Sequence, residues 1–214
     1  DPMTLEARLN ARCDDEVFEV RWSLRCLRSG LELGRQDRFQ QWSASTRKVS
    51  VMMALLAMVQ RGKVSLDRQI TYTREMGQGV QSGTFQFMTP GFTFSLRDAM
   101  ANMIITSDNV CTNQVFLALG DEDEARIQVV NDYCRAIGLR DTVHRFLWQN
   151  TKLNRWHHSD EGMTVTSARD QVNLLTWMVQ GSRDAAAAAR IGVTPELCAM
   201  ALDFMRSEFG LSGM

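Results

Sequence analysis

The sequence predicts an α+β protein in which a short antiparallel β-hairpin precedes a largely helical region. Three patterns lead to this fold class. Residues 18–28 alternate apolar and polar side chains and are rich in strand-forming residue types. Residues 46–60 are apolar almost all round, which is typical of a helix buried on every side. Ser95 and Ser167 each begin a Ser-x-x-Asp sequence before an apolar run, which marks the start of a helix.

The first half of the chain supplies the hairpin and the buried helix. Residues 4–13 show helical spacing and predict a first helix. Ser29-Gly30 marks a turn after the first strand, so we expect a return strand over 31–38. The helix over 46–60 ends at Arg61-Gly62, and the glycine-rich residues 76–91 predict a long structured loop.

The second half reads as helices joined by one long loop. The helix that begins at Ser95 stops just before Ser107, and two more follow near 111–119 and 122–137. Residues 139–163 have no clear period, and a loop of that length inside a compact domain is often functional. Two further helices begin at Ser167 and at Thr194-Pro195.

The composition is that of an ordinary globular protein and argues against several classes of partner. Of 214 residues, 44% are hydrophobic and 23% are charged, and the formal net charge is −1. This balance does not suggest nucleic acid or an anionic membrane as partner. No uncharged apolar run approaches the ~18 residues of a membrane span. The five cysteines form no Cys-x-x-Cys pair, so we expect small buried side chains rather than a zinc site.

Ser45 and Lys48 form a Ser-x-x-Lys sequence at the start of the buried helix. The spacing places an amine one helical turn from a hydroxyl, and a lysine whose pKa is lowered can take the hydroxyl proton. We expect Ser45 at a strand-to-helix junction, where free backbone N–H groups can stabilise an oxyanion. The alternative is a plain helix cap at Ser45 or Thr46, with Lys48 solvated.

Ser107-Asp108-Asn109 is a second motif between two predicted helices. The Ser107 hydroxyl could relay a proton between a leaving group and Lys48. The Asn109 amide can both donate and accept hydrogen bonds, so it could hold a substrate amide and the lysine ammonium. The alternative is a helix cap, since all three residue types favour such positions.

The stretches WSASTRKVSVMMALL, MTPGFTFSLRDAM and MIITSDNVCTNQVF resemble class A β-lactamases and their relatives in the serine β-lactamase and penicillin-binding protein superfamily. The resemblance runs from about residue 18 to the chain end. It implies that Ser45 is the acylated nucleophile, Lys48 its proton acceptor, Ser107 the proton relay and Asn109 a ligand of the substrate amide. It also implies an α-helical domain packed on an α/β sandwich with an antiparallel sheet, to which the N-terminal hairpin gives two strands.

The loop over 139–163 resembles the omega loop of that family, but it departs from the pattern. Leu153-Asn154 fits the family's Leu-Asn pair and makes Asn154 a substrate-binding residue by resemblance. The match puts Asn150 in the place of the glutamate that activates the deacylating water. A slip of one residue would put Gln149 there. Neither amide can act as a base, so acylation would proceed while deacylation would be slow.

Other groups in this loop are weaker possibilities. Asp160 or Glu161 could replace the missing base, although solvated loop acids are the commoner case. His157 and His158 have no carboxylate partner at a known metal spacing, and we expect them at the surface. The resemblance implies no metal and no organic cofactor.

The third motif of the family, Lys-Thr-Gly or a variant on an inner strand, is absent from the sequence. After Lys48 come only Lys63 and Lys152, and neither precedes Thr-Gly or Ser-Gly. Two hairpin strands alone would expose a hydrophobic face and two edges. We therefore expect this chain to be a fragment, completed by a companion chain with the C-terminal strands, shortened by deletion, or continued by residues outside the sequence.

Three segments follow from this interpretation. Residues 1–42 hold the first helix and the hairpin, residues 43–182 form the mainly helical domain with both motifs, and residues 183–214 hold a return helix that leads to the missing strands. The expected function is that of a serine hydrolase acting on a β-lactam or related amide. The alternatives are a DD-peptidase or esterase-like relative with slow deacylation, and a catalytically silent ligand-binding module. The family favours a periplasmic or secreted location, and a cytoplasmic one stays open.

Overall fold

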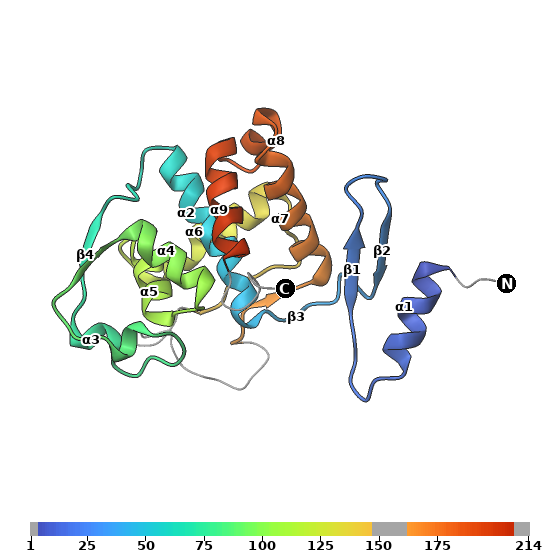
Figure 1. Ribbon diagram of the computed structural model, residues 1–214, viewed down its shortest axis with the longest axis horizontal. Coiled ribbons are helices and arrows are strands. Elements are labelled where there is room, and N and C mark those ends of the chain that lie inside the picture. Colours follow the sequence, from blue (N-terminus) through green and yellow to red (C-terminus); the bar gives the residue numbers. More distant parts are fainter. Residues whose placement is uncertain (1–3, 147–161, 208–214) are drawn as a thin grey trace.

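The computed structural model describes residues 4–146 and 162–207, and four of its helices pack around one buried central helix (Figure 1). That helix is α2 (Arg47–Gln60), in which every side chain from Val51 to Ala57 is buried. It contacts α4 (Leu96–Ile105), α5 (Asn109–Leu117), α6 (Asp123–Ile137) and α9 (Pro195–Arg206). The prediction of a helix apolar almost all round is confirmed, because its neighbours cover nearly its whole circumference.

The predicted N-terminal helix and hairpin are confirmed, with shorter strands. Helix α1 (Leu5–Asp14) lies against β2 (Glu32–Arg35), which pairs antiparallel with β1 (Trp22–Arg25). Beyond the paired residues the chain turns at Gly30, whose φ of 73° is left-handed. Figure 1 shows the hairpin beside α7 (Ala168–Gly181), with α1 on its outer side.

An arginine on α7 ties the hairpin to the helical region. The Arg169 guanidinium lies 2.6 Å from a carboxylate oxygen of Glu32 and 2.6 Å from one of Asp37. The Arg169 backbone N–H also donates to the Asp37 carbonyl at 2.7 Å. These contacts fix the hairpin relative to α7.

Two further antiparallel strand pairs were not predicted from the sequence. Strand β3 (Gln41–Trp42) pairs with β6 (Val165–Thr166), and β4 (Gln69–Thr71) pairs with β5 (Thr93–Ser95). Strands of two or three residues are too short to show a period of two. The β3–β6 pair matters for function, because it brings residues 164–166 next to the start of α2.

The glycine-rich stretch over 76–91 has short helical turns where only a loop was expected. Helix α3 (Arg74–Gly77) and the 3₁₀ turn η2 (Phe85–Phe87) interrupt it. The Phe85 ring packs edge-on against Tyr72 and Phe94, with centroids 6.2 and 5.0 Å apart. This aromatic cluster anchors the loop.

Helix caps largely follow the predictions. Ser95 and Asp98 form the predicted reciprocal capping box. Ser167 caps α7 through the Asp170 N–H, but the Asp170 carboxylate accepts from the Asp141 N–H and the Thr142 hydroxyl instead, each at 2.8 Å. The expected second capping box is therefore wrong in one respect: the Asp170 side chain does not return a hydrogen bond to the backbone of Ser167.

Of the two helices that follow α7, one was predicted from the sequence and one was not. Thr194 caps α9 with Pro195 at its first position, as predicted. The alanine run forms α8 (Ala185–Arg190), which the sequence analysis left unassigned. The division of the chain at residues 42 and 182 stays a prediction.

The cysteines are free thiols. Cys111, Cys134 and Cys198 are buried, as expected for small apolar side chains, while Cys13 and Cys26 are only partly buried. None of the helices within residues 4–146 and 162–207 has the length and apolar character needed to cross a membrane.

Candidate active site

Ser45 lies in a 3₁₀ turn, η1 (Ala44–Thr46), that runs directly into α2. The Ser43 N–H donates to the Thr164 carbonyl at 2.9 Å, so the β3–β6 region fixes this turn. Ala44 has a left-handed φ of 43°, and Ser45 is exposed. The serine thus stands at the predicted junction, where the first N–H groups of a helix have no intrahelical acceptor.

Lys48 is buried, with 2% of its surface exposed. Its Nζ lies 2.7 Å from the Ser107 carbonyl oxygen, 2.8 Å from Ser107 Oγ and 2.7 Å from Asn109 Oδ1. Thr46 is the N-cap residue of α2 and makes no side-chain cap bond. The alternative of a plain helix cap with a solvated lysine is therefore wrong.

Ser107 joins the two motifs. Its Oγ donates to Ser45 Oγ at 2.9 Å while it accepts from Lys48 Nζ at 2.8 Å. Helix α4 ends at Ile105 and α5 begins at Asn109, and Ser107 turns the chain between them with a left-handed φ of 55°. Such a conformation is uncommon for a residue other than glycine and recurs at functional sites. It lets both oxygens of Ser107 face the lysine.

Asp108 is the cap that the alternative interpretation of this motif predicted. It is fully buried, and its carboxylate accepts from the Cys111 N–H at 3.0 Å, at the start of α5. The same carboxylate accepts from the Phe85 N–H at 2.8 Å. The motif therefore both caps a helix and supplies Ser107 and Asn109 to the site.

Residues 81–85 lie against this motif, and the sequence analysis missed them. The Asn109 side-chain amide donates to the Gln81 carbonyl, and its backbone N–H donates to the Ser82 carbonyl at 3.3 Å. Gly83 has a φ of 95°, and a Cβ there would lie 2.2 Å from an Asp108 carboxylate oxygen. The glycine was the available signal, because such a close approach allows no side chain.

The electrostatic setting favours a neutral lysine. Burial lowers the pKa of Lys48 from 10.5 to about 7, and the charge of Arg47 acts in the same direction. Asp108 and Cys111 oppose the shift. A large fraction of Lys48 is thus neutral near pH 7, as a proton acceptor must be.

A cavity of about 360 Å³ opens beside Ser45, Lys48 and Ser107. Ser45, Lys48 and Ser107 line it together with Gln171 from α7 and an apolar wall made of Val49, Met103, Ile104, Leu175 and Met205. Its volume suits a small ligand, and an apolar wall with a few converging polar groups is typical of such sites.

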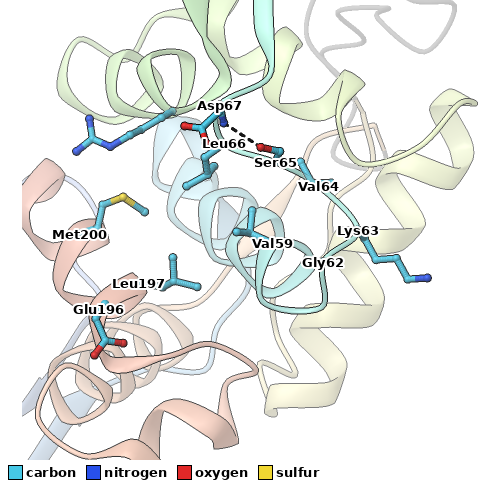
Figure 2. Close-up of a pocket in the computed structure, with 11 residues that line it drawn as sticks. Val59, Gly62, Lys63, Val64, Ser65, Leu66, Asp67, Glu196, Leu197 and Met200 are labelled. Atoms are coloured by element: carbon cyan, nitrogen blue, oxygen red, sulfur yellow. Dashed lines mark hydrogen bonds between the residues drawn. The ribbon is translucent and has the colours of Figure 1, made fainter.

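A second, more open cavity of about 820 Å³ lies at the opposite end of α2. Figure 2 shows Val59 of α2 facing Leu197 and Met200 of α9 across it. Ser45, Lys48 and Ser107 line the smaller cavity instead.

Several predicted site residues lie outside the described part of the chain. These are Gln149, Asn150, Asn154, His157, His158, Asp160 and Glu161. Within the described residues, no three His, Cys, Asp or Glu side chains gather as a metal site would require.

The fold has close counterparts among solved structures. A β-lactamase from Sphaerobacter thermophilus DSM 20745 superposes with a TM-score of 0.77 at 20% identity, over 94% of this chain and 68% of that one. PBP-A gives 0.76 at 23% identity, over 95% and 68% of the two chains. A PBP-A variant in an acyl-enzyme complex with penicillin G gives 0.65 at 24%, over 88% and 61%.

These structures share the fold, and the chain spans about two thirds of their length. No curated protein sequence matches the chain. The model of the beta-lactamase enzyme family matches residues 4–208, nearly the whole chain. The mixed, helix-rich architecture, its small antiparallel sheets and this match agree, and the chain belongs to the beta-lactamase enzyme family.

Proposed function

We propose that this protein is a serine hydrolase in which Ser45 attacks the carbonyl carbon of a β-lactam or related amide and becomes acylated. The observation that carries the proposal is the unbroken series of hydrogen bonds from Lys48 Nζ through Ser107 Oγ to Ser45 Oγ, at 2.8 and 2.9 Å. The series ends on an exposed hydroxyl at the wall of a ligand-sized cavity.

The contacts of Lys48 define the direction in which a proton can move. The Ser107 carbonyl and Asn109 Oδ1 accept only, so both need a donor from Nζ. An ammonium group has a third N–H, which points to Ser107 Oγ. When Lys48 is neutral, this third position becomes a lone pair, and Ser107 reverses to donate to it. Ser107 can then accept from the Ser45 hydroxyl, so that the whole series points toward the lysine.

Acylation follows from this reversed arrangement. As Ser45 Oγ bonds to the substrate carbonyl carbon, its proton passes to Ser107 and the Ser107 proton passes to Lys48. Collapse of the tetrahedral intermediate breaks the C–N bond, and the departing nitrogen takes a proton from Lys48 through Ser107. The serine proton thus ends on the leaving amine, and Lys48 is neutral again.

Intact-mass spectrometry after incubation with benzylpenicillin tests this function. We expect a mass gain of one penicillin on the wild-type protein and none on Ser45→Ala. Folded wild-type protein that shows neither a mass gain nor hydrolysis of benzylpenicillin would contradict the proposal and leave the catalytically silent binding module. An equal gain on Ser45→Ala would contradict it by showing that another residue is acylated. Peptide mapping should place the adduct on the segment that contains Ser45.

A DD-peptidase or esterase-like relative with slow deacylation is the second candidate, favoured by the sequence. The Leu153-Asn154 match puts Asn150, or Gln149 in the neighbouring register, where a general base would stand. An amide cannot accept the proton of a hydrolytic water. An adduct that persists for hours would support this candidate, whereas steady-state nitrocefin turnover would support a β-lactamase.

A further inference from the structure

Arg47 stands between Ser45 and Lys48 in the sequence, and its side chain is almost completely buried, with 1% of its surface exposed. One guanidinium nitrogen, Nη1, donates to Thr164 Oγ1 at 3.0 Å, and Nη2 donates to the Phe146 carbonyl at 2.9 Å. Phe146 and Thr164 are far apart in the sequence and stand on either side of residues 147–161. One side chain of α2 therefore binds both a residue within the predicted omega-like loop over 139–163 and the residue that directly follows it.

The acceptor at Phe146 belongs to a firmly held stretch of chain. The Asn131 side chain of α6 bonds both the backbone N–H and the carbonyl of His144, each at 2.8 Å. His144 Nε2 lies 2.9 Å from Ser50 Oγ of α2. The Arg47 guanidinium also faces the Phe146 ring, 4.4 Å from its centroid. Arg47 thus binds a fixed framework, and its position on α2 is well determined.

Arg47 directly precedes Lys48 on α2, both side chains are buried, and the charge of Arg47 acts on the lysine. Burial lowers the pKa of Arg47 to about 9, so the guanidinium remains positive at pH 7. The neighbouring His144 is neutral there, because burial and the Arg47 charge hold its pKa well below 6.5. Burial raises the pKa of the Cys111 thiol, so that group is also neutral. Among the groups that act on Lys48, Arg47 thus opposes Asp108.

We propose that Arg47 is a positioning residue with two effects: its buried charge favours the unprotonated form of Lys48, and its paired hydrogen bonds align Phe146 and Thr164 with the turn that carries Ser45. The proposal deepens the proposed function and rests on it for its catalytic meaning. A lysine beside a like charge gives up its proton more readily, because each cation raises the cost of the other. Fixing the start of α2 against Phe146 and Thr164 keeps Ser45 in its attacking position.

Two substitutions separate the effects. Arg47→Met keeps an unbranched side chain with an apolar stem and removes the positive charge. Arg47→Lys keeps the charge but lacks the planar fork that reaches Phe146 and Thr164 together. Arg97→Met is the matched control. Arg97 also lies over an aromatic ring, 5.2 Å from the centroid of Phe204, but it lines the cavity at the opposite end of α2.

The charge effect can be measured without substrate. The chain has three lysines, so the ¹³Cε signals of lysine-labelled protein can be followed individually, with Lys48→Arg identifying one of them. We expect the Lys48 midpoint near pH 7 in the wild type and in Arg97→Met, and roughly one unit higher in Arg47→Met. Arg47→Lys should keep the wild-type midpoint. Arg47→Gln, neutral yet able to donate to Phe146, gives the same comparison should Arg47→Met fail to fold.

An unchanged Lys48 midpoint in a folded neutral variant would overturn the charge effect. The alignment effect predicts that Arg47→Lys is acylated by benzylpenicillin about tenfold more slowly than wild type at a pH where Lys48 is neutral. Equal rates would overturn it. If wild-type Ser45 is never acylated although the midpoints move as expected, the proposed function fails and the charge effect stands.

Discussion

Ser107 Oγ lies 2.9 Å from Ser45 Oγ, although 62 positions separate the two residues in the chain. The same hydroxyl lies 2.8 Å from Lys48 Nζ, which makes it the middle member of the proposed proton path. A hydroxyl suits this place because it can donate and accept at the same time.

Removing that middle member should slow acylation without unfolding the protein. In Ser107→Ala the Ser45 proton loses its relay to Lys48, and we expect the acylation rate with benzylpenicillin to fall by roughly 10²–10⁴. Time-resolved intact-mass spectrometry gives this rate. Ser29→Ala, in the exposed hairpin turn, is the matched control and should react like the wild type. A Ser107→Ala rate within a factor of about two of wild type would show that protons reach Lys48 by another route.

Acylation should depend on pH through the protonation of Lys48. The pKa of the lysine is lowered to about 7, and only the neutral amine can accept a proton. The rate should therefore rise through about pH 7 and level off above it, falling about tenfold per unit on the acid side. Single-turnover rates from about pH 5 to about pH 9 would reveal this limb. A flat profile, with the fold intact throughout, would exclude Lys48 as the base.

Most of the helices and both motifs could be recognised from the sequence because those signals are local. The periodicity of residues 46–60 and the Ser95 cap both lie within a few residues of the structure they define. The sequence did not reveal the β3–β6 pair, which depends on contacts between residues more than a hundred positions apart. A two-residue strand has no periodicity of its own to detect.

The same distinction applies to the active site. Ser45, Lys48, Ser107 and Asn109 were named from their motifs, and the structure brings them together. Arg47 sits within the first motif but was given no role of its own, and Asp108 was considered only as one of three possible helix caps, because the sequence does not show which buried groups they face. Their contacts with Thr164 and Phe85 come from chain segments that only the tertiary fold places nearby.

A negative charge at Asn109 should make Lys48 a poorer base. In Asn109→Asp a carboxylate oxygen replaces the amide oxygen that lies 2.7 Å from Lys48 Nζ. An adjacent opposite charge raises the pKa of a lysine by about 1–3 units, so acylation at pH 7 should fall and recover at higher pH.

The control for this charge is Asn102→Asp on α4, where the exposed Asn102 side-chain amide donates to the Asp98 carbonyl one helical turn away at 2.9 Å. It adds the same charge and should leave the pH profile unchanged. The explanation would be wrong if Asn109→Asp lost activity equally at every pH, since that would indicate lost substrate binding rather than a change in the lysine.

A side chain at Gly83 should separate the 81–85 segment from the active site. In Gly83→Ala the new Cβ would lie 2.2 Å from an Asp108 carboxylate oxygen and 2.5 Å from its Cα, at a φ of 95°. Both the collision with backbone and the left-handed conformation oppose this change, so we expect a loss of about 3 kcal/mol or more in the free energy of unfolding. Acylation should slow as well, because Asn109 is held by this segment.

Gly62→Ala separates the two causes. Gly62 is also left-handed, with a φ of 67°, but nothing lies within 4 Å of its Cβ position. Its cost should be about 1 kcal/mol, from the backbone conformation alone. Urea unfolding of both variants measures the difference, and acylation rates report on the site. Equal destabilisation would mean that Asp108 and Gly83 can move apart freely, and the 81–85 segment would then not contribute to holding Asn109 against Lys48.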